Sequence, residues 1–448
     1  MNKATVVGAG LAGCEAAWAL ARRGVAVELR EMKPRTYTPA HHYPGFAELV
    51  CSNSLKAMRL ESAAGLLKEE MRMMGSLTMR CAARCAVSAG GALAVDRTAF
   101  SDLVTAAIRG EPLITVVPGE VRTIPEGPVI VATGPLTTQA LSDDIAGRCG
   151  AGRLSFFDAV APIVSRDSID MEQVFFAARY DRGEADYINC PFDKPQYEAF
   201  WQALTTAEQA PLHDFDQRDF KVYEGCMPVE VLAKRGQDAI RFGPLKPVGL
   251  RNPRTGHRPW AAVQLRREDE TGTMFNLVGF QTNLKFSEQK RVFSMIPGLQ
   301  NAEFLRYGVM HRNTFLDSPR LLDSSFCLRA DRSIWFAGQI TGVEGYIESA
   351  ASGIVAGINL ARALADKPPL PLPADCMTGA LAAYISNPAV ADFQPMGCNM
   401  GLLPPPAKHI KDKRLRYETV ARSALERLAA ALQSCGEGDP DYRREESL

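Results

Sequence analysis

The sequence lacks an excess of charge of either sign. Its 51 lysine and arginine residues balance 51 aspartate and glutamate residues, so the formal net charge is zero. A strongly basic chain would have pointed to nucleic acid, whereas this chain must bind any acidic partner through a local patch. The 448 residues are 46% hydrophobic, which is ordinary for a folded globular protein of roughly two to four domains.

Long apolar runs and metal-binding cysteine pairs are also missing. No run approaches the length of a membrane span, and the first residues, MNKATVVGAGLAG, enter a strand and a glycine turn rather than a signal peptide. The eleven cysteines include no CxxC pair, and Cys81 and Cys85 have no second pair nearby. We therefore expect a cytoplasmic protein with free thiols, no membrane association and no metal site.

A dinucleotide-binding motif occupies residues 4–31, with the sequence ATVVGAGLAGCEAAWALARRGVAVELRE. An apolar strand is followed by Gly8, Gly10 and Gly13 in G-x-G-x-x-G spacing, then by a helix, a second strand and Glu31. Gly8 allows a tight turn, Gly10 lets a pyrophosphate approach the backbone, and Gly13 allows the helix to pack closely on the strand. Glu31 can accept hydrogen bonds from ribose hydroxyls. The pattern predicts nucleotide binding at the helix N-terminus.

Two later segments favour FAD over NAD as the bound nucleotide. The segment 127–136, GPVIVATGPL, is an apolar strand ending in Ala-Thr-Gly. The segment 332–362 is a strand, a glycine-rich turn and a small-residue helix from about Glu344. Flavoproteins with two dinucleotide-binding motifs usually carry aspartate at the position of Gln339. That helix N-terminus could stabilise negative charge on a reduced flavin. The additional candidate FAD contacts are Thr133, Gly134, Gly338, Gln339 and Gly345.

The order of the motifs predicts an α/β fold of the two-dinucleotide-fold flavoprotein type, with a smaller α+β insertion. Residues 1–164 and 301–448 form the predicted FAD-binding domain, because the first and last FAD motifs must meet in space. Residues 165–300 form the predicted insertion, with short strands and a helix near 196–206. The stretch 408–433 is typical of a basic helix, and the residues after it of a frayed tail.

Two cysteines and one basic segment are candidate functional features. Cys51 lies in ELVCSNSLKA, and Cys226 lies on a predicted turn in VYEGCMPVEVLAKRG, close to lysine and arginine. Nearby cations favour the reactive thiolate, but the residues alone leave both cysteines open as quiet core positions. The segment 241–260 forms a local basic, aromatic-bearing patch. Its basic residues include Lys246, Arg251, Arg254, His257 and Arg258.

Several motifs together resemble one family closely. They include GAGLAGCEAAW, FAELVCSNSL, GGALAVDR, VIVATGPLT, YEGCMPVEVLAKRG, RFGPLKPVGL, RYGVMHRNTF and FAGQITGVEGYIESAASGIVAGIN. The resemblance is to TrmFO, the folate- and FAD-dependent tRNA (uracil-5-)-methyltransferases, and runs from residue 2 to past residue 403. A more distant similarity is to the GidA/MnmG proteins, which carry an additional C-terminal domain.

The resemblance implies methylation of C5 of uridine 54 in the tRNA T-loop. The carbon donor would be 5,10-methylenetetrahydrofolate, and NADH or NADPH would reduce the FAD. Uracil C5 is a poor nucleophile until a thiolate adds to C6, and a base must then remove the C5 proton. Family membership suggests Cys226 as the C6 nucleophile and Cys51 as its partner, the proton-abstracting base. The uridine would have to flip out of its stacked position.

Further site residues are implied by the same resemblance. His311 and Tyr346 would hold the folate beside the flavin, although His311 could equally be a buried structural histidine. His41 and His42 could lie near the flavin or cap a loop. A basic face near the C-terminus could contact RNA phosphates or be a solvated helix surface. Its residues are Lys408, Lys411, Lys413, Arg414 and Arg416.

Three alternative functions stay open from the sequence. The same chemistry could act on a ribosomal RNA uridine, and the protein could be a flavoprotein that binds RNA without methylating it. The third alternative is a flavin oxidoreductase for small molecules, which the absence of a CxxxxC pair beside the glycine loop disfavours. We expect a monomer that binds tRNA, folate and NAD(P)H.

Overall fold

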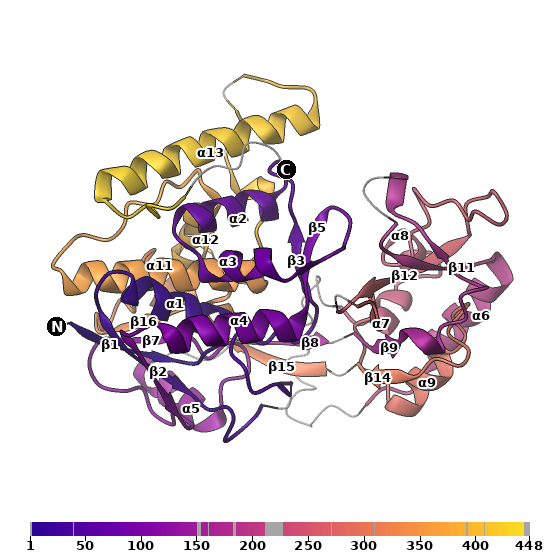
Figure 1. Cartoon of the computed structure of the whole chain (residues 1–448), viewed down its shortest axis with the longest axis horizontal. Helices are drawn as coiled ribbons and strands as arrows, with labels where there is room; N and C mark the ends of the chain where they lie inside the picture. The colour runs from indigo at the N-terminus through magenta and orange to yellow at the C-terminus, as the bar shows by residue number, and fades with distance from the viewer. Residues whose placement is uncertain are drawn as a thin grey trace.

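The chain folds into two lobes joined by a pair of strands (Figure 1). The structure is a computed structural model, and it describes residues 2–38, 40–149, 154–159, 161–181, 185–210, 227–269, 271–308, 310–390, 393–406 and 408–442. We call residues 2–159 and 310–442 the nucleotide lobe and residues 161–308 the insertion lobe.

A five-stranded parallel sheet forms the centre of the nucleotide lobe, with the order β16-β7-β1-β2-β6. Two of its strands, β7 and β16, read as continuous apolar runs, as expected where helices cover both faces of a parallel sheet. The residues of β7 and β16 are accordingly all buried. The strands are β1 (Lys3–Val7), β2 (Ala26–Glu31), β6 (Ile114–Pro118), β7 (Val129–Val131) and β16 (Ile334–Phe336).

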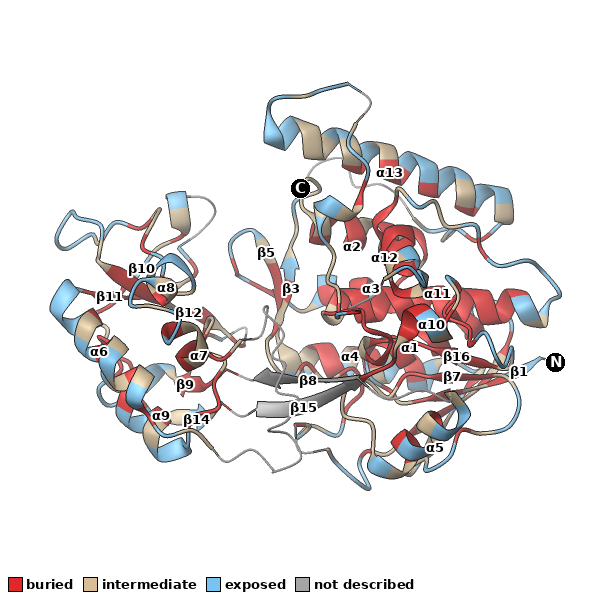
Figure 2. Cartoon of the chain, turned by 180° about the vertical axis from the view of Figure 1, so that it is seen from behind, coloured by how far each residue is buried: buried red, intermediate tan, exposed pale blue. Residues whose placement is uncertain are grey.

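Two long helices, α1 (Leu11–Ala21) and α11 (Tyr346–Leu364), pack against each other over this sheet. Nearly all of their residues are buried, as the red ribbons of Figure 2 show. Glycines at 353 and 357 permit the close approach, because a Cβ at Gly353 would lie 2.2 Å from the carbonyl oxygen of Ala12. The packing brings the N-termini of both helices to the same end of the sheet.

The remaining helices and a small sheet complete the nucleotide lobe. Ser62, Ser76 and Asp96 each cap the N-terminus of a helix with a side-chain oxygen. The helices are α2 (Ala63–Met73), α3 (Leu77–Arg84), α4 (Arg97–Gly110), α5 (Gln139–Cys149), α10 (Ser318–Leu321), α12 (Met377–Ser386) and α13 (Lys413–Cys435). The small sheet has the order β3-β5-β4, with β3 (Ser54–Ala57), β4 (Ala86–Val87) and β5 (Ala92–Val95).

The insertion lobe has its own sheet, of order β10-β11-β12-β13-β9-β14, and its own hydrophobic core. Its strands are β9 (Ile163–Ser165), β10 (Phe175–Phe176), β11 (Ile188–Phe192), β12 (Ala261–Arg267), β13 (Met274–Leu277) and β14 (Phe304–Arg306). Its helices are α6 (Lys194–Thr206), α7 (Val229–Ala233), α8 (Ala239–Phe242) and α9 (Phe286–Phe293). Because β9 pairs with β14, the lobe extends a few residues beyond both ends of the predicted range 165–300.

The connection between the lobes is a two-stranded antiparallel ribbon. The chain leaves the nucleotide lobe through β8 (Leu154–Ala159) and returns through β15 (Met310–Phe315). Figure 1 shows both strands between the lobes. The register pairs Leu154 with Phe315, so the two crossings lie side by side.

The C-terminal region differs from its prediction in two ways. The helix α13 begins at Lys413 rather than near residue 408, because Asp412 caps it by accepting the N–H of Leu415. The tail expected to fray is docked as far as residue 442. Glu437 is buried and forms ion pairs with Arg23 and Arg362.

The sequence led us to expect neither a membrane-spanning segment nor a metal site. Within the part of the chain that the structure describes, no helix combines the length and apolar character that a membrane crossing requires. The same residues contain no cluster of three or more histidine, cysteine or acidic side chains arranged to bind a metal ion.

Candidate cofactor cavity and the Cys51 site

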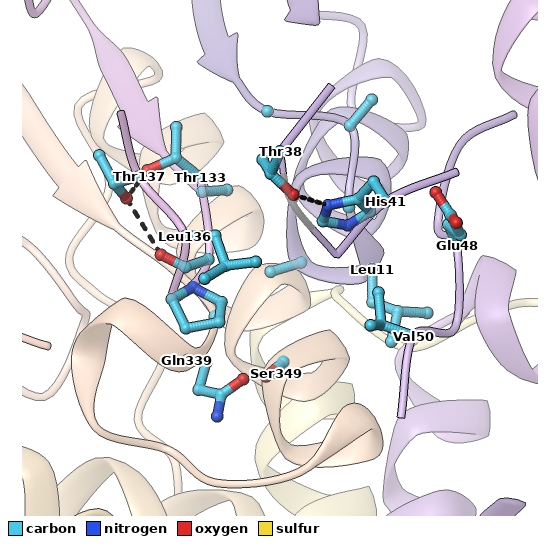
Figure 3. A pocket seen from close by; sticks show the side chains of 18 of the residues that line it. Leu11, Thr38, His41, Glu48, Val50, Thr133, Leu136, Thr137, Gln339 and Ser349 are labelled. Carbon is cyan, nitrogen blue, oxygen red and sulfur yellow. Dashed lines mark hydrogen bonds between the residues drawn. The ribbon is translucent and has the colours of Figure 1, made fainter. Parts of the chain in front are cut away.

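A cavity of about 480 Å³ lies where the glycine loop, the end of β7 and the N-termini of α1 and α11 meet. Figure 3 shows side chains that line it, among them Thr38, His41 and Glu48 on one side and Thr133 and Gln339 on the other. Eleven residues singled out from the sequence line this one cavity: Gly8, Gly10, Glu31, His41, Cys51, Thr133, Gly134, Gly338, Gln339, Gly345 and Tyr346.

The three glycines of the first loop have different surroundings. A Cβ at Gly8 would lie 2.6 Å from the carbonyl oxygen of Ala132, and a Cβ at Gly13 would lie 1.8 Å from that of Gly8. Gly13 does not line the cavity and instead lets α1 pack against the loop. A Cβ at Gly10 would meet no protein atom within 4 Å. Gly10 is therefore the point at which a ligand could come closest to the backbone.

Both helices that point at the cavity begin without a side-chain cap. Gly10 precedes α1 and Gly345 precedes α11, and neither offers a side-chain acceptor to the first-turn N–H groups. The first-turn residues Leu11 and Ile347 line the cavity. Two uncapped helix N-termini at one cavity provide donors and positive dipole ends for an anionic ligand such as a pyrophosphate.

Glu31, Thr133 and Gln339 hold the walls of the cavity in place. The buried Glu31 carboxylate accepts the N–H groups of Ala9 at 2.7 Å and Lys33 at 2.8 Å, so it fixes the glycine loop while still lining the cavity. The hydroxyl groups of Thr133 and Thr137 lie 2.6 Å apart (Figure 3). Gln339 donates to the carboxylate of Glu344 at 2.8 Å, which leaves the amide oxygen of Gln339 as an acceptor.

His41 lines the cavity, whereas its neighbour His42 is exposed. The Nδ1 atom of His41 lies 2.6 Å from the hydroxyl oxygen of Thr38. Burial is the main cause that lowers the pKa of His41, and Glu48 opposes the shift. A lowered pKa leaves the imidazole neutral at pH 7, so His41 offers a hydrogen bond to a ligand rather than a charge.

Cys51 lies in the wall of the cavity and contacts Tyr346. The phenolic oxygen of Tyr346 accepts the backbone N–H groups of Cys51 at 2.7 Å and Ser52 at 3.3 Å. The Sγ atom of Cys51 lies 3.0 Å from the same oxygen. Because two N–H groups occupy the oxygen's acceptor positions, its own proton is left to donate to sulfur. This geometry favours the thiolate form of Cys51.

Tyr346 keeps that proton. Burial first, and then the neighbouring Cys51, raise the pKa of Tyr346 well above its ordinary value. A phenol that stays protonated is a donor to a thiolate and not a base that competes with it.

Two arginines that the sequence did not single out hold the Cys51 loop. Arg97 of α4 and Arg306 of β14 each donate to the carbonyl oxygen of Val50 at 2.9 Å. Burial first, and then the neighbouring Arg97, lower the pKa of Arg306 to about 10, so it is still cationic at neutral pH. Glu268 of the insertion lobe pairs with Arg97 at 2.5 Å. Two cations beside Cys51, offset by one carboxylate, again favour a thiolate.

The second cysteine and one histidine could not be placed at the cavity. Cys226 lies outside the described residues. His311 lies in β15 opposite Asp158 in register, and its side chain is outside the described part of the chain. Neither predicted role is tested by the structure.

The predicted RNA-binding residues lie at the start of α13 and in the segment before it. Lys408 and Lys411 precede the helix and are exposed. Arg414 forms an ion pair with Glu61 at 3.2 Å, and Lys413 and Arg416 lie over the ring of Tyr417. They form a basic surface of the nucleotide lobe, and its role stays a prediction.

Replacing Tyr346 with phenylalanine tests the proposed donor to Cys51. We expect the pH at which Cys51 reacts half-maximally with iodoacetamide to rise by about one unit, because a hydrogen bond to a charged group contributes about 1.5 kcal/mol. Peptide mass spectrometry would isolate Cys51 from the other thiols. Tyr384→Phe is the matched control, since its hydroxyl donates to Gln394 away from the cavity. An unchanged alkylation profile in Tyr346→Phe would remove the argument for this donor.

The parallel sheet, the glycine loop and the cavity between two helix N-termini define a flavoprotein fold of the two-dinucleotide-binding class. A sequence model of the glucose inhibited division protein A family, GidA, matches residues 3–368. Two crystal structures of Aquifex aeolicus GidA share the fold, with TM-scores of 0.67 and 0.68 at 16% and 17% identity. Each alignment covers 97% of this chain, and 76% and 78% of the GidA chains.

Curated relatives narrow the class to one family. A methylenetetrahydrofolate–tRNA-(uracil-5-)-methyltransferase TrmFO from Acetivibrio thermocellus is 58% identical, over 93% of this chain and 96% of its own length. The TrmFO of Pelotomaculum thermopropionicum is 59% identical, over 94% of this chain and 96% of its own. The chain belongs to the TrmFO family. The resemblance inferred from the sequence motifs is confirmed.

Proposed function

We propose that this protein methylates C5 of uridine 54 in the T-loop of tRNA, with 5,10-methylenetetrahydrofolate as the carbon donor. The observation that carries the proposal is the position of Cys51, whose thiol lines the nucleotide cavity at 3.0 Å from the Tyr346 hydroxyl. Relatives at 58% and 59% identity bear the name of this activity. A cavity that only binds a nucleotide has no need of a thiol held in a polarising environment.

The residues of the cavity fit FAD. Gly10 leaves open space at the backbone, and the uncapped N-termini of α1 and α11 supply donors for a pyrophosphate and for the flavin ring system. Glu31 and Gln339 offer oxygen acceptors for ribose and ribityl hydroxyl groups. FAD bound there and reduced by NADH or NADPH would supply the electrons and the one-carbon transfer chemistry.

The protein's own groups prepare the uracil. A thiolate adds to C6, which gives C5 the character of an enolate carbon, and we assign this step to Cys226. Once C5 has formed its bond to the one-carbon unit, Cys51 removes the C5 proton, with Tyr346 donating to its thiolate before the transfer. Arg97 and Arg306 fix the loop that carries Cys51 through the carbonyl of Val50. Elimination of Cys226 from C6 completes the cycle.

The remaining partners follow from the same proposal. Tyr346 and His311 hold the folate beside the flavin, and the basic residues from Lys408 to Arg416 contact tRNA phosphates. The enzyme acts as a monomer in the cytoplasm, where tRNA and reduced nicotinamide nucleotides occur. Size-exclusion chromatography with light scattering would check the oligomeric state.

One assay tests the proposed function. The protein is incubated with 5,10-methylenetetrahydrofolate, NADPH and unmodified tRNA, and 5-methyluridine is mapped by mass spectrometry. We expect a methyl group at uridine 54. Methylation of ribosomal RNA but not tRNA would select the alternative substrate. Binding of tRNA with no methylation of either RNA would select a non-catalytic role.

A further inference from the structure

The insertion lobe carries a concentration of positive charge that the proposed reaction does not use. Residues 231–260 contain seven lysine and arginine residues and one aspartate, a formal charge of +6, within a chain of zero net charge. The segment runs from α7 through α8 to the start of β12. We call it the insertion basic surface. Most of its cations are exposed.

Within the described part of the chain, four of these seven cations form no ion pair: Lys246, Arg251, Arg254 and Arg258. Among the described residues, the one ion pair of the surface joins Arg241 to Asp238 at 3.4 Å. Arg254 donates to the carbonyl oxygen of Met171 at 2.8 Å, which leaves its charge unpaired. Lys234 interacts electrostatically with Glu230, whereas three exposed cations have no side-chain partner in the described part of the chain: Lys246, Arg251 and Arg258. Exposed cations without a carboxylate partner attract a polyanion most strongly.

The backbone beneath these cations is held firmly. Arg179 donates to the carbonyl oxygens of Lys246 and Val248, and the N–H of Tyr180 donates to Gly249. The next loop is closed by bonds from the N–H of Asn252 to His257 and from the N–H of Gly256 to Asn252, at 2.9 and 2.8 Å. The backbone that carries these cations is therefore held in place, which reduces the backbone entropy lost on binding.

An exposed aromatic ring lies within the same surface. Phe242 is 68% exposed, the largest value among the exposed large hydrophobic residues. The Arg241 guanidinium lies 5.4 Å from the ring of Phe242 and 3.9 Å from that of Trp260. A ring with a free face beside several cations suits a nucleic acid, whose bases stack on aromatic rings while its phosphates pair with cations.

We propose that the insertion basic surface binds the phosphate backbone of the tRNA away from the target uridine, with Phe242 stacking on an unpaired base. The inference rests on the proposed function, because the tRNA is the polyanion that this function brings to the protein. Figures 1 and 2 show α8 and α13 near the same upper edge of the molecule, on different lobes. The two basic regions thus give the tRNA one contact on each lobe.

A triple substitution of exposed cations tests the surface. Lys246→Gln, Arg251→Gln and Arg258→Gln together are expected to weaken tRNA binding about 10- to 100-fold at 150 mM salt. The slope of log Kd against log salt should fall by about 3, since each phosphate contact contributes about 0.9. Arg254 is kept because its bond to Met171 supports the fold. The control neutralises three exposed cations of the nucleotide lobe: Arg22, Arg122 and Lys367.

Phe242→Ala tests the stacking contact separately. We expect about tenfold weaker tRNA binding with an unchanged salt slope, because stacking involves no counterion release.

FAD absorbance and the melting temperature would confirm that each variant is folded. If wild-type protein methylates tRNA but the triple variant binds tRNA as tightly as the control does, the inference fails and the proposed function stands. If wild-type protein neither binds nor methylates tRNA, the proposed function itself fails. Unchanged binding in Phe242→Ala would overturn the stacking contact.

Discussion

Cys51→Ala is expected to lower the rate of tRNA methylation by about 10²- to 10⁴-fold, the usual contribution of a positioned base. The thiol lies in the cavity wall, held by Tyr346 and by the loop that Arg97 and Arg306 anchor. Its removal leaves the C5 proton of the uracil without an acceptor. Cofactor binding should persist, because a small side chain is lost from one wall only.

The measurement is single-turnover methylation of tRNA, with FAD content from the absorbance spectrum. Cys149→Ala is the matched control, since Cys149 is a half-buried cysteine at the end of α5 and does not line the cavity. The control should keep the wild-type rate. A Cys51→Ala protein with full FAD and the wild-type rate would show that the proposed base lies elsewhere.

Gly10→Val is expected to abolish FAD binding while leaving the apo-protein folded. The backbone of Gly10 is extended, with φ −73° and ψ −172°, which valine adopts without strain. A Cβ there would meet no protein atom within 4 Å, so the fold has room for it. The added methyl groups would instead occupy the space where a pyrophosphate must approach the backbone. We expect an affinity loss of more than about 100-fold, because the ligand cannot avoid the obstruction.

Titration of the apo-protein with FAD and thermal unfolding without cofactor separate the two effects. Comparison must use the apo forms, because a bound cofactor stabilises the wild type by mass action. Gly147→Val is the control, since a Cβ at this exposed position of α5 also meets no protein atom within 4 Å. Normal FAD affinity in Gly10→Val would mean that the nucleotide takes a different path through the cavity.

The nucleotide lobe could be predicted because its signals are local. A strand, three spaced glycines, a helix and a second strand follow one another within residues 3–31. The steric need for glycine is visible in the structure, with Gly8 and Gly13 each facing a carbonyl oxygen. The predicted helix is α1, which begins at Leu11, directly after Gly10.

The surroundings of Cys51 could not be predicted because they are assembled from distant segments. Arg97 and Arg306 are 209 positions apart, yet both bind the carbonyl of Val50. Any residue type can supply a backbone carbonyl oxygen, so a hydrogen bond from a side chain to that oxygen leaves no pattern in the sequence around it. The docked C-terminal tail was missed for a similar reason. Its polar composition is typical of a frayed end, but Glu437 is neutralised by Arg23, in the turn after α1, and by Arg362 of α11.

The loop that carries Cys51 is tied to both lobes at once. Arg97 reaches it from the nucleotide lobe, whereas Arg306 and Arg266 reach Val50 and Ser52 from the insertion lobe. A rotation of the insertion lobe about its two-stranded connection must therefore either break these bonds or move Cys51 relative to the cavity. Attachment of RNA to the outer lobe and the position of the reactive thiol are thus mechanically coupled.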